Sequence, residues 1–419
     1  MMMNSTIKFI KYLIYFLVIT LPLSMFGQQK NLDFFIDEAI QNSPLLKENN
    51  NGLLLNKLDS LQILAQYKLQ VNAISNNSYA PVIRGYGYDE IITNVRNFNE
   101  QISATKTFTS KKNLKIQFNG IQLLNDSLST ANKLTEQDLR RTVVAAYVAA
   151  YGSWRQYNFN NEIYNVLSKE DTILRKLTQA SVYRQTDYLT FLVTLKQQHL
   201  SITQARQQFQ DDYATLNYLC GLVDTSFTPL DSPHIAVTQL PDYNNSIFYK
   251  KFETDSLLLK NATQQVALAY KPKLSVSADG GYVSSLTITP YKNFGVAAGI
   301  NLIIPIYDGN QRRLQYQRLH ILEQTRINNR DFYTSQYKQQ VAQLSQQLQI
   351  TNLVITETND QLKYVHALID ANQKLLITGD VRIADYIIAI NNYLSAQNNV
   401  TQNIVRQFQI ITQINYWNR

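Results

Sequence analysis

The residues that most often carry chemistry are few in this chain and lie far apart. The 419 residues include one cysteine and four histidines, and no histidine falls in an HExxH or similar metal-binding spacing. The histidines are His199, His234, His320 and His366. Cys220 has no histidine near it in sequence and is expected to be a buried structural thiol, and Gly280-Gly281 is explained by turn or strand geometry. The sequence therefore predicts no enzyme, no cofactor and no metal site.

Two aspartates occupy positions where a charge could act on passing ions. Asp187 follows the predicted helix-to-helix turn 181–184, and Asp385 follows the corresponding turn 378–382. If such turns from several copies of the chain met around an aqueous mouth, each aspartate would repeat as a ring of like charges. An aspartate early in a helix also simply stabilises the helix dipole. Asp187 and Asp385 are thus candidates for an entrance constriction. The candidates for contacts with a partner at the helix tips are Arg184, Arg382, Gly379 and Asp380.

Three further residues mark a predicted change from strand to helix in the stretch Phe294–Arg313. Its first half alternates between apolar and small polar residues, which is the period of a strand. Pro305 cannot donate to a strand ladder, Asp308 is a good helix N-cap, and the chain after Gly309 is polar and helix-forming. An uncharged apolar face opposite a small polar face suits a wall between lipid and water, and it equally suits a half-buried strand of a soluble sheet.

The helix that follows favours a membrane wall over a soluble sheet. Between Asn310 and Thr378 there is no proline or glycine, and apolar residues recur three and four positions apart. Unbroken, this segment would be on the order of 100 Å long. Such a helix is too long for a globular domain and too polar for a membrane span. The pattern indicates a barrel standing on a helical tunnel.

Composition indicates a folded, mainly helical, exported protein. Hydrophobic residues make up 45% and charged residues 17% of the chain, which excludes wholesale disorder. The net charge of +8 is spread along the chain, which argues against nucleic-acid binding. Lys8 and Lys11 precede a short apolar run, so residues 1–27 are predicted to be a cleaved signal peptide, with an uncleaved anchor as the alternative. No cysteine lies near the cleavage site, so no lipid anchor is expected.

One order of elements is predicted twice. The first copy, 28–220, has helices, strands at about 69–88 and 98–108, and a long helical hairpin at about 113–219. The second copy, 244–419, has a helix, strands at about 272–283 and 293–306, and a hairpin at about 309–417. An extended connector, 221–243, joins them. Asp187-Tyr188 matches Asp385-Tyr386 at a separation of 198 residues, and Leu69 matches Leu274 at 205, so the mature chain is predicted to be an internal duplication.

Four segments, in this order, resemble the TolC-like outer-membrane efflux proteins. They are LDFFIDEAIQNSP near the start, KPKLSVSADGGY, the strand-to-helix junction INLIIPIYDGNQRR, and the closing GDVRIADY with INYW. The resemblance covers essentially the whole chain after residue 30. It implies a passive channel for efflux or secretion: a homotrimer in the outer membrane, with four strands per chain in a shared barrel above a periplasmic helical tunnel. It also implies docking to a periplasmic adaptor protein and an inner-membrane transporter.

The resemblance also bears on particular residues and on the oligomer. Asp385 takes the place of an aspartate that helps to constrict the family's periplasmic entrance, while a second aspartate of some members is Ile388 here. From the residues alone, four strands are too few to close a membrane barrel, and two copies or three would serve; the resemblance favours three. The alternative is a periplasmic coiled-coil scaffold or adaptor whose strands form a soluble domain.

Overall fold

The computed structural model describes residues 30–89, 91, 95–238, 243–286 and 289–417. The predicted signal peptide, 1–27, lies outside the described residues, as does part of the predicted connector. The first half of the chain contains α2 (Leu32–Asn42), α3 (Pro44–Gln66), β1 (Gln70–Tyr79), β2 (Arg96–Phe108), α5 (Lys111–Gln179) and α6 (Gln185–Cys220). The second half contains η1 (Tyr243–Asn245), α7 (Ile247–Ala269), β3 (Lys273–Ser284), η2 (Pro290–Lys292), β4 (Phe294–Ile303), α8 (Gln311–Thr378) and α9 (Ile383–Trp417).

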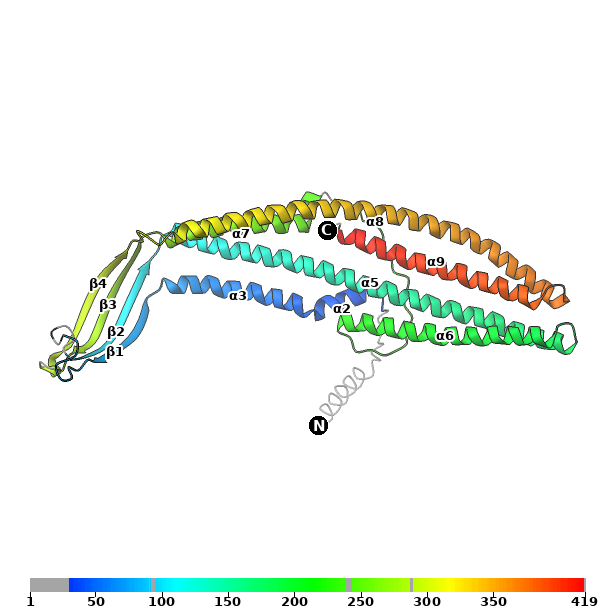
Figure 1. The fold of residues 1–419 in the computed structure, drawn as a ribbon, viewed down its shortest axis with the longest axis horizontal. Helices are drawn as coiled ribbons and strands as arrows, with labels where there is room; N and C mark the ends of the chain where they lie inside the picture. Colours follow the sequence, from blue (N-terminus) through cyan, green and yellow to red (C-terminus); the bar gives the residue numbers. More distant parts are fainter. Residues whose placement is uncertain (1–29, 90, 92–94, 239–242, 287–288, 418–419) are drawn as a thin grey trace, which may run out of the picture. The chain divides into compact units, whose positions relative to one another are not determined.

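The four strands form one antiparallel sheet in the order β1-β2-β3-β4. The strands lie side by side, and α3, α5, α7 and α8 all join the sheet at the same end (Figure 1). Hairpin loops connect β1 to β2 and β3 to β4 at the other end. β1 and β4 are edge strands with no partner on their outer sides among the described residues.

Two predicted strands end earlier than expected, both close to a proline. The first strand was expected to reach residue 88, but it ends at Tyr79, before Pro81; residues 83–86 form a turn with Gly85 at φ 82°. The fourth strand was expected to reach residue 306, but it ends at Ile303, before Pro305. Proline has no N–H to donate, so neither strand's ladder continues through it.

The chain divides into two compact units. One unit comprises residues up to Ala39 together with 146–234, and its core is a cluster of aromatic rings. The ring centroids of Phe209 lie 5.2 Å from those of Trp154 and 5.0 Å from those of Phe227. The side chain of Phe35 is fully buried, and its carbonyl oxygen accepts from the Sγ of Cys220 at 3.2 Å. Cys220 is buried, as predicted, and burial raises the pKa of its thiol to about 12.

Polar contacts fasten the beginning of the described chain to this core. Lys30 pairs with the carboxylate of Asp224, which also accepts from the hydroxyl of Tyr213 at 3.1 Å. The backbone N–H of Ser226 donates to the other oxygen of Asp224 at 2.8 Å. With every partner donating, the pKa of Asp224 is held far below its usual range, first by Lys30.

The second unit, 40–145 and 235–419, contains the sheet and the α8–α9 hairpin. Leu344 of α8 packs with Ile410 and Ile414 of α9 in a buried cluster, and Trp417 packs against it. Side chains three and four apart on α8 supply its buried stripe, as the predicted spacing requires. Most of the helix surface is left to uncharged polar residues.

We predict that Asp224→Asn lowers the thermal unfolding temperature at neutral pH. Because the folded pKa is depressed, the ion pair stabilises the protein above the carboxyl's ordinary pKa of 3.8, and this stabilisation is lost as the pH falls further. The difference between wild type and variant should therefore shrink below about pH 4. Asp211→Asn, at an exposed residue of α6 without an ion pair among the described residues, is the control. A pH-independent difference would contradict this account.

Candidate functional site

One face of the sheet is apolar and open. Residues directly opposite in register share a face, and Leu274 pairs with Leu302, Val276 with Ile300 and Ala278 with Ala298. We call this the apolar face; its members are Val71, Ala73, Ile102, Ala104, Leu274, Val276, Ala278, Val296, Ala298, Ile300 and Leu302. Val296 is 91% exposed and Ile300 79% exposed, so no element of the described chain covers this face.

The apolar face is framed by aromatic and charged residues toward its two ends. At the loop end, Tyr282 lies opposite Phe294 with ring centroids 5.1 Å apart. Glu100 shares this end, and its Oε1 accepts from Asn77 at 2.7 Å and from Ser75 at 2.8 Å. At the helix end, Phe108 and Lys106 lie on the same face. The span from Leu274 to Tyr282 is about 26 Å along the strand.

The opposite face is mostly small and polar. Ser103 pairs with Asp279, Thr105 with Ser277, and Ser275 with Asn301. We call this the polar face. Asp279 was not predicted as a site residue, although its position in the alternating run 273–284, in phase with Ser275 and Ser277, was the signal that placed it there.

The structure places Pro305, Asp308 and Gly309 between β4 and α8, as predicted, but the role of Asp308 differs from the prediction. Asp308 is not the N-cap residue of α8; that position is Asn310, which adopts φ 67° after Gly309 at φ 66°. The carboxylate of Asp308 still caps the helix, because it accepts from the backbone N–H of Arg312 at 2.7 Å. This bond, followed by one from the hydroxyl of Tyr270, lowers the pKa of Asp308. Two consecutive residues with positive φ move the cap position two residues downstream.

The α8–α9 turn is a Schellman motif followed by an ion pair. Gly379 adopts φ 81°, and the N–H of Asp380 donates to the carbonyl of Leu375 at 3.0 Å. Arg382 then donates to both carboxylate oxygens of Asp385, each at 2.9 Å. The pKa of Asp385 is lowered, first by this hydrogen bonding and then by the charge of Arg382. The candidate entrance aspartate is therefore paired within its own turn, which the spacing of three residues at a helix start could have indicated.

The α5–α6 turn has the same backbone but a different electrostatic arrangement. Ser181 adopts φ 64° in the position of Gly379, and the N–H of Val182 donates to the carbonyl of Leu177 at 2.9 Å. Asp187 stands third in α6, as Asp385 does in α9. Among the described residues, however, neither Asp187 nor Arg184 forms an ion pair. The same sequence spacing thus yields a pair in one turn and none in the other.

The described residues show no metal-binding cluster and no membrane-spanning helix. No three histidine, cysteine, aspartate or glutamate side chains gather as they would to hold a metal ion in the part of the chain that the structure describes. Within that same part, no helix combines the length and the apolar character needed to cross a membrane.

Comparison with solved structures identifies the architecture. CusC, a protein that undergoes conformational changes accompanying folding and transmembrane channel formation, superposes with a TM-score of 0.73 at 13% identity, over 93% of this chain and 92% of its own. The outer membrane protein VceC of Vibrio cholerae gives a TM-score of 0.70 at 14% identity, over 92% of this chain and 96% of its own. This chain has the TolC-like fold.

Other TolC-like structures agree. The open state of the Neisseria gonorrhoeae outer membrane channel MtrE has a TM-score of 0.71 at 11% identity, over 92% of this chain and 88% of its own. No family model matches this sequence, and no curated protein matches it. At these identities the likeness resides in the TolC-like arrangement of helices and strands, and roles for single residues need separate tests.

The two turns of this TolC-like chain allow a matched pair of substitutions. Ser181→Gly should stabilise the protein by about 0.5–1 kcal/mol, because glycine adopts positive φ without steric cost. Gly379→Ala should destabilise it by about 1 kcal/mol, because a Cβ is disfavoured there. Denaturant midpoints measure both changes. Equal effects of the same sign would show that the left-handed backbone at these turns does not control stability.

Proposed function

We propose that this protein is the outer-membrane channel of a tripartite efflux or secretion system, a passive trimeric duct rather than an enzyme. The observation that carries the proposal is the uncovered sheet. No described residue covers its apolar face, its opposite face is mostly small and polar, and its strands continue into helices of up to 69 residues. The TolC-like fold, shared with proteins described as outer membrane channels, supports it. In this proposal substrates pass from a periplasmic adaptor and an inner-membrane transporter to the exterior.

Unpaired strand edges support a barrel shared among copies. In hydrocarbon each unpaired backbone group costs several kcal/mol, so β1 and β4 need partners if the sheet lies in a membrane. Four strands are too few for a closed membrane barrel, for which about eight is the minimum. Edge pairing of β4 with β1 of the next copy closes the ring. We propose three copies, following the TolC-like fold, and an apolar face in contact with outer-membrane lipid.

Equivalent caps in the two halves support an internal duplication. α3 and α7 both have 23 residues, both begin after a serine that accepts a backbone hydrogen bond, and both end at a tyrosine. Ser43 with Ser246 and Tyr67 with Tyr270 give a separation of 203 (246 − 43 and 270 − 67). In the proposed duplication we therefore use a separation of 203 in place of the 205 expected from Leu69 and Leu274. The first β-hairpin is then five residues longer than the second (203 − 198).

A further equivalence lies at the ends of the two hairpins. Asn217 of α6 donates its amide to the carbonyl of Asp224 at 3.0 Å. Asn415 of α9, 198 residues later, donates its amide to the carbonyl of Ala236 at 2.7 Å. Each asparagine therefore holds one part of the extended connector by its backbone, as related positions of a duplicated unit would.

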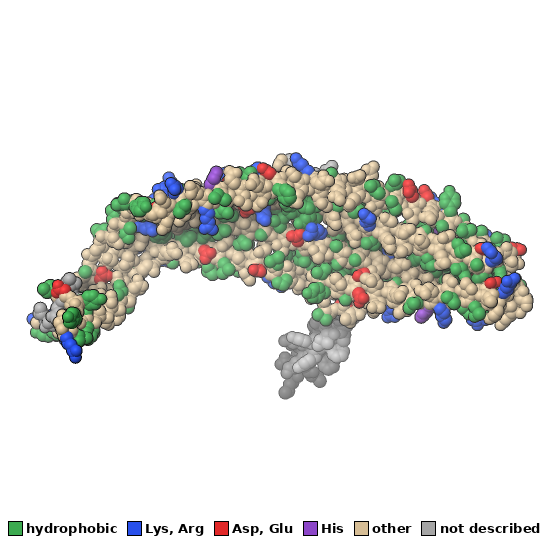
Figure 2. All heavy atoms as spheres, in the orientation of Figure 1, with side chains coloured by type: hydrophobic (Ala, Val, Ile, Leu, Met, Phe, Trp, Pro, Cys, Tyr) green, Lys and Arg blue, Asp and Glu red, His purple; other side chains and the backbone are tan. Residues whose placement is uncertain are grey.

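The surface of the long helices suits a polyspecific conduit. Charged side chains are scattered over the visible face of the molecule, and uncharged groups cover most of it (Figure 2). The exposed positions of α8 include several glutamines. A wall of this kind is wetted without retaining one solute tightly. The helix tips, with Arg184, Arg382, Gly379 and Asp380, are the proposed contacts with the adaptor.

Export completes the proposal. Residues 1–27 are a proposed cleaved signal peptide, and retention at the outer membrane rests on the sheet, not on a lipid anchor. The second candidate function, a periplasmic coiled-coil scaffold, requires both faces of the sheet to contact water or protein.

Two adjacent alanines of β4 separate these functions. Ala298 lies on the apolar face and Ala297 on the polar face, where it is opposite Asp279. In a membrane barrel, Ala298→Arg should cost about 2–4 kcal/mol and sharply reduce the amount of folded protein in outer-membrane fractions, whereas Ala297→Arg should be tolerated. Fractionation and detergent-extracted yield measure both. Because both alanines are exposed in the single chain, a soluble scaffold should tolerate the two variants equally, and that result would refute the membrane assignment.

The ion pair at the α8–α9 turn gives a test of the proposed entrance. Arg382→Gln leaves an unpaired carboxylate on each copy and should shift single-channel selectivity toward cations. Asp385→Asn leaves an unpaired guanidinium and should shift it toward anions. Asp360→Asn, which removes a comparable exposed pair with Lys363 along α8, is the control. Reversal potentials in a salt gradient across planar bilayers measure the shift. Identical reversal potentials for all three variants would show that Asp385 does not lie at the entrance.

A further inference from the structure

Basic residues from four separate stretches of sequence meet where the sheet joins the helices. The set, which we call the basic belt, comprises Lys68, Lys106, Lys111, Lys112, Lys115, Lys271, Lys273, Arg312 and Arg313. The same junctions, 67–70, 105–116, 270–274 and 302–314, contain a single acidic residue, Asp308. In sequence these residues are scattered pairs and singles. Only the topology, with α3, α5, α7 and α8 joining the sheet at one end, gathers them (Figure 1).

The other end of the sheet lacks this excess. The hairpin loops 80–96 and 284–293 contain three basic and two acidic residues. The belt is therefore a property of the helix end and not of the sheet as a whole. None of its nine members forms an ion pair with a described residue. The guanidinium of Arg312 lies over the rings of Tyr270 and Tyr316, 5.4 and 5.7 Å from their centroids. No described carboxylate forms an ion pair with the belt, so its net positive charge can attract an anionic partner.

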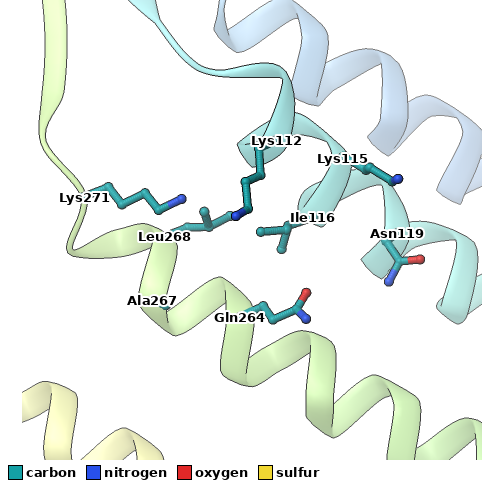
Figure 3. A pocket seen from close by; sticks show the side chains of 8 residues that line it. All are labelled: Lys112, Lys115, Ile116, Asn119, Gln264, Ala267, Leu268 and Lys271. Atoms are coloured by element: carbon teal, nitrogen blue, oxygen red, sulfur yellow. The ribbon is translucent and has the colours of Figure 1, made fainter.

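Part of the belt lines a pocket between α5 and α7. The pocket has a volume of about 570 Å³. Lys112 and Lys271 extend toward one another across it, above the apolar side chains of Ile116 and Leu268 (Figure 3). Lys115, Asn119, Gln264 and Ala267 complete the lining, and no carboxylate is among the lining residues. Asn113 accepts from the ammonium of Lys271 at 2.8 Å. The site thus joins two facing cations to an apolar floor.

We propose that the basic belt, through this pocket, binds the phosphate groups of anionic phospholipids in the periplasmic leaflet of the outer membrane. The inference rests on the proposed function, which places the apolar face in hydrocarbon and hence the helix end of the sheet at a headgroup layer. Lysines at that level attract anionic headgroups, and their aliphatic stems lie along apolar surface. The phosphate lies between Lys112 and Lys271, and the glycerol and upper acyl carbons lie on the apolar floor.

Lipid retention by the detergent-purified full chain, measured by native mass spectrometry, tests the proposal. Phosphatidylglycerol and phosphatidylcholine with the same acyl chains are the probes. Wild type should retain phosphatidylglycerol in preference to phosphatidylcholine. In the triple variant K112Q/K115Q/K271Q the ratio of retained phosphatidylglycerol to phosphatidylcholine should fall about tenfold. The triple variant K169Q/K176Q/K196Q, which removes the same charge from the α5–α6 hairpin, should keep it. The Lys→Arg triple at the pocket, which keeps the charge, should also keep it and exclude misfolding as the cause.

The possible results distinguish a failure of the lipid site from a failure of the proposed channel function. If the pocket triple retains phosphatidylglycerol as wild type does, or if the hairpin triple loses it equally, the lipid site is wrong while the channel stands. If wild type retains neither lipid and remains monodisperse without detergent, the channel assignment fails and the lipid site fails with it.

Discussion

The constraint on which the rest of the structure depends is the pairing of backbone groups at the edges of a four-stranded sheet. A sheet whose apolar face is open to its surroundings must find hydrocarbon or protein to cover it, and in hydrocarbon its two outer strands cannot leave their N–H and C=O groups unpaired. Within the part of one chain that the structure describes, the outer edges of β1 and β4 have no partner strand. The proposed ring of identical chains would supply both the partner strands and an enclosed polar face. In this account assembly is a condition for the protein's stability in the membrane as well as for transport.

The sequence was informative wherever one residue type decided the local backbone. β4 ends just before Pro305, and the absence of glycine and proline leaves α8 uninterrupted over 68 residues. The alternation of residues in Phe294–Ile303 predicted the two faces of the strand correctly. The unusual order of elements made the TolC-like fold recognisable at identities of 11–14%. The first strand was predicted too long: it ends at Tyr79, because Pro81 has no N–H to donate to the ladder.

What the sequence could not supply were relations between side chains that local spacing leaves open. Arg382 and Asp385 pair while Arg184 and Asp187, with the same spacing, do not. The segments 184–187 and 382–385 have the same spacing, and in each the backbone N–H of the aspartate donates to the carbonyl of the arginine, so spacing alone does not distinguish them. Likewise, the basic belt is invisible in the linear chain because its members come from four junctions that only the sheet topology brings to one level. Asp308 was expected at the N-cap and instead caps α8 from two residues upstream, since Gly309 and Asn310 both adopt positive φ.

In the proposed assembly the barrel is completed only by sister chains, and the mass of the purified particle tests this most directly. Light scattering coupled to size-exclusion chromatography separates the protein mass from the bound detergent. We expect a detergent-bound particle whose protein mass equals three mature chains. A monodisperse single chain that stays in solution without detergent would contradict it.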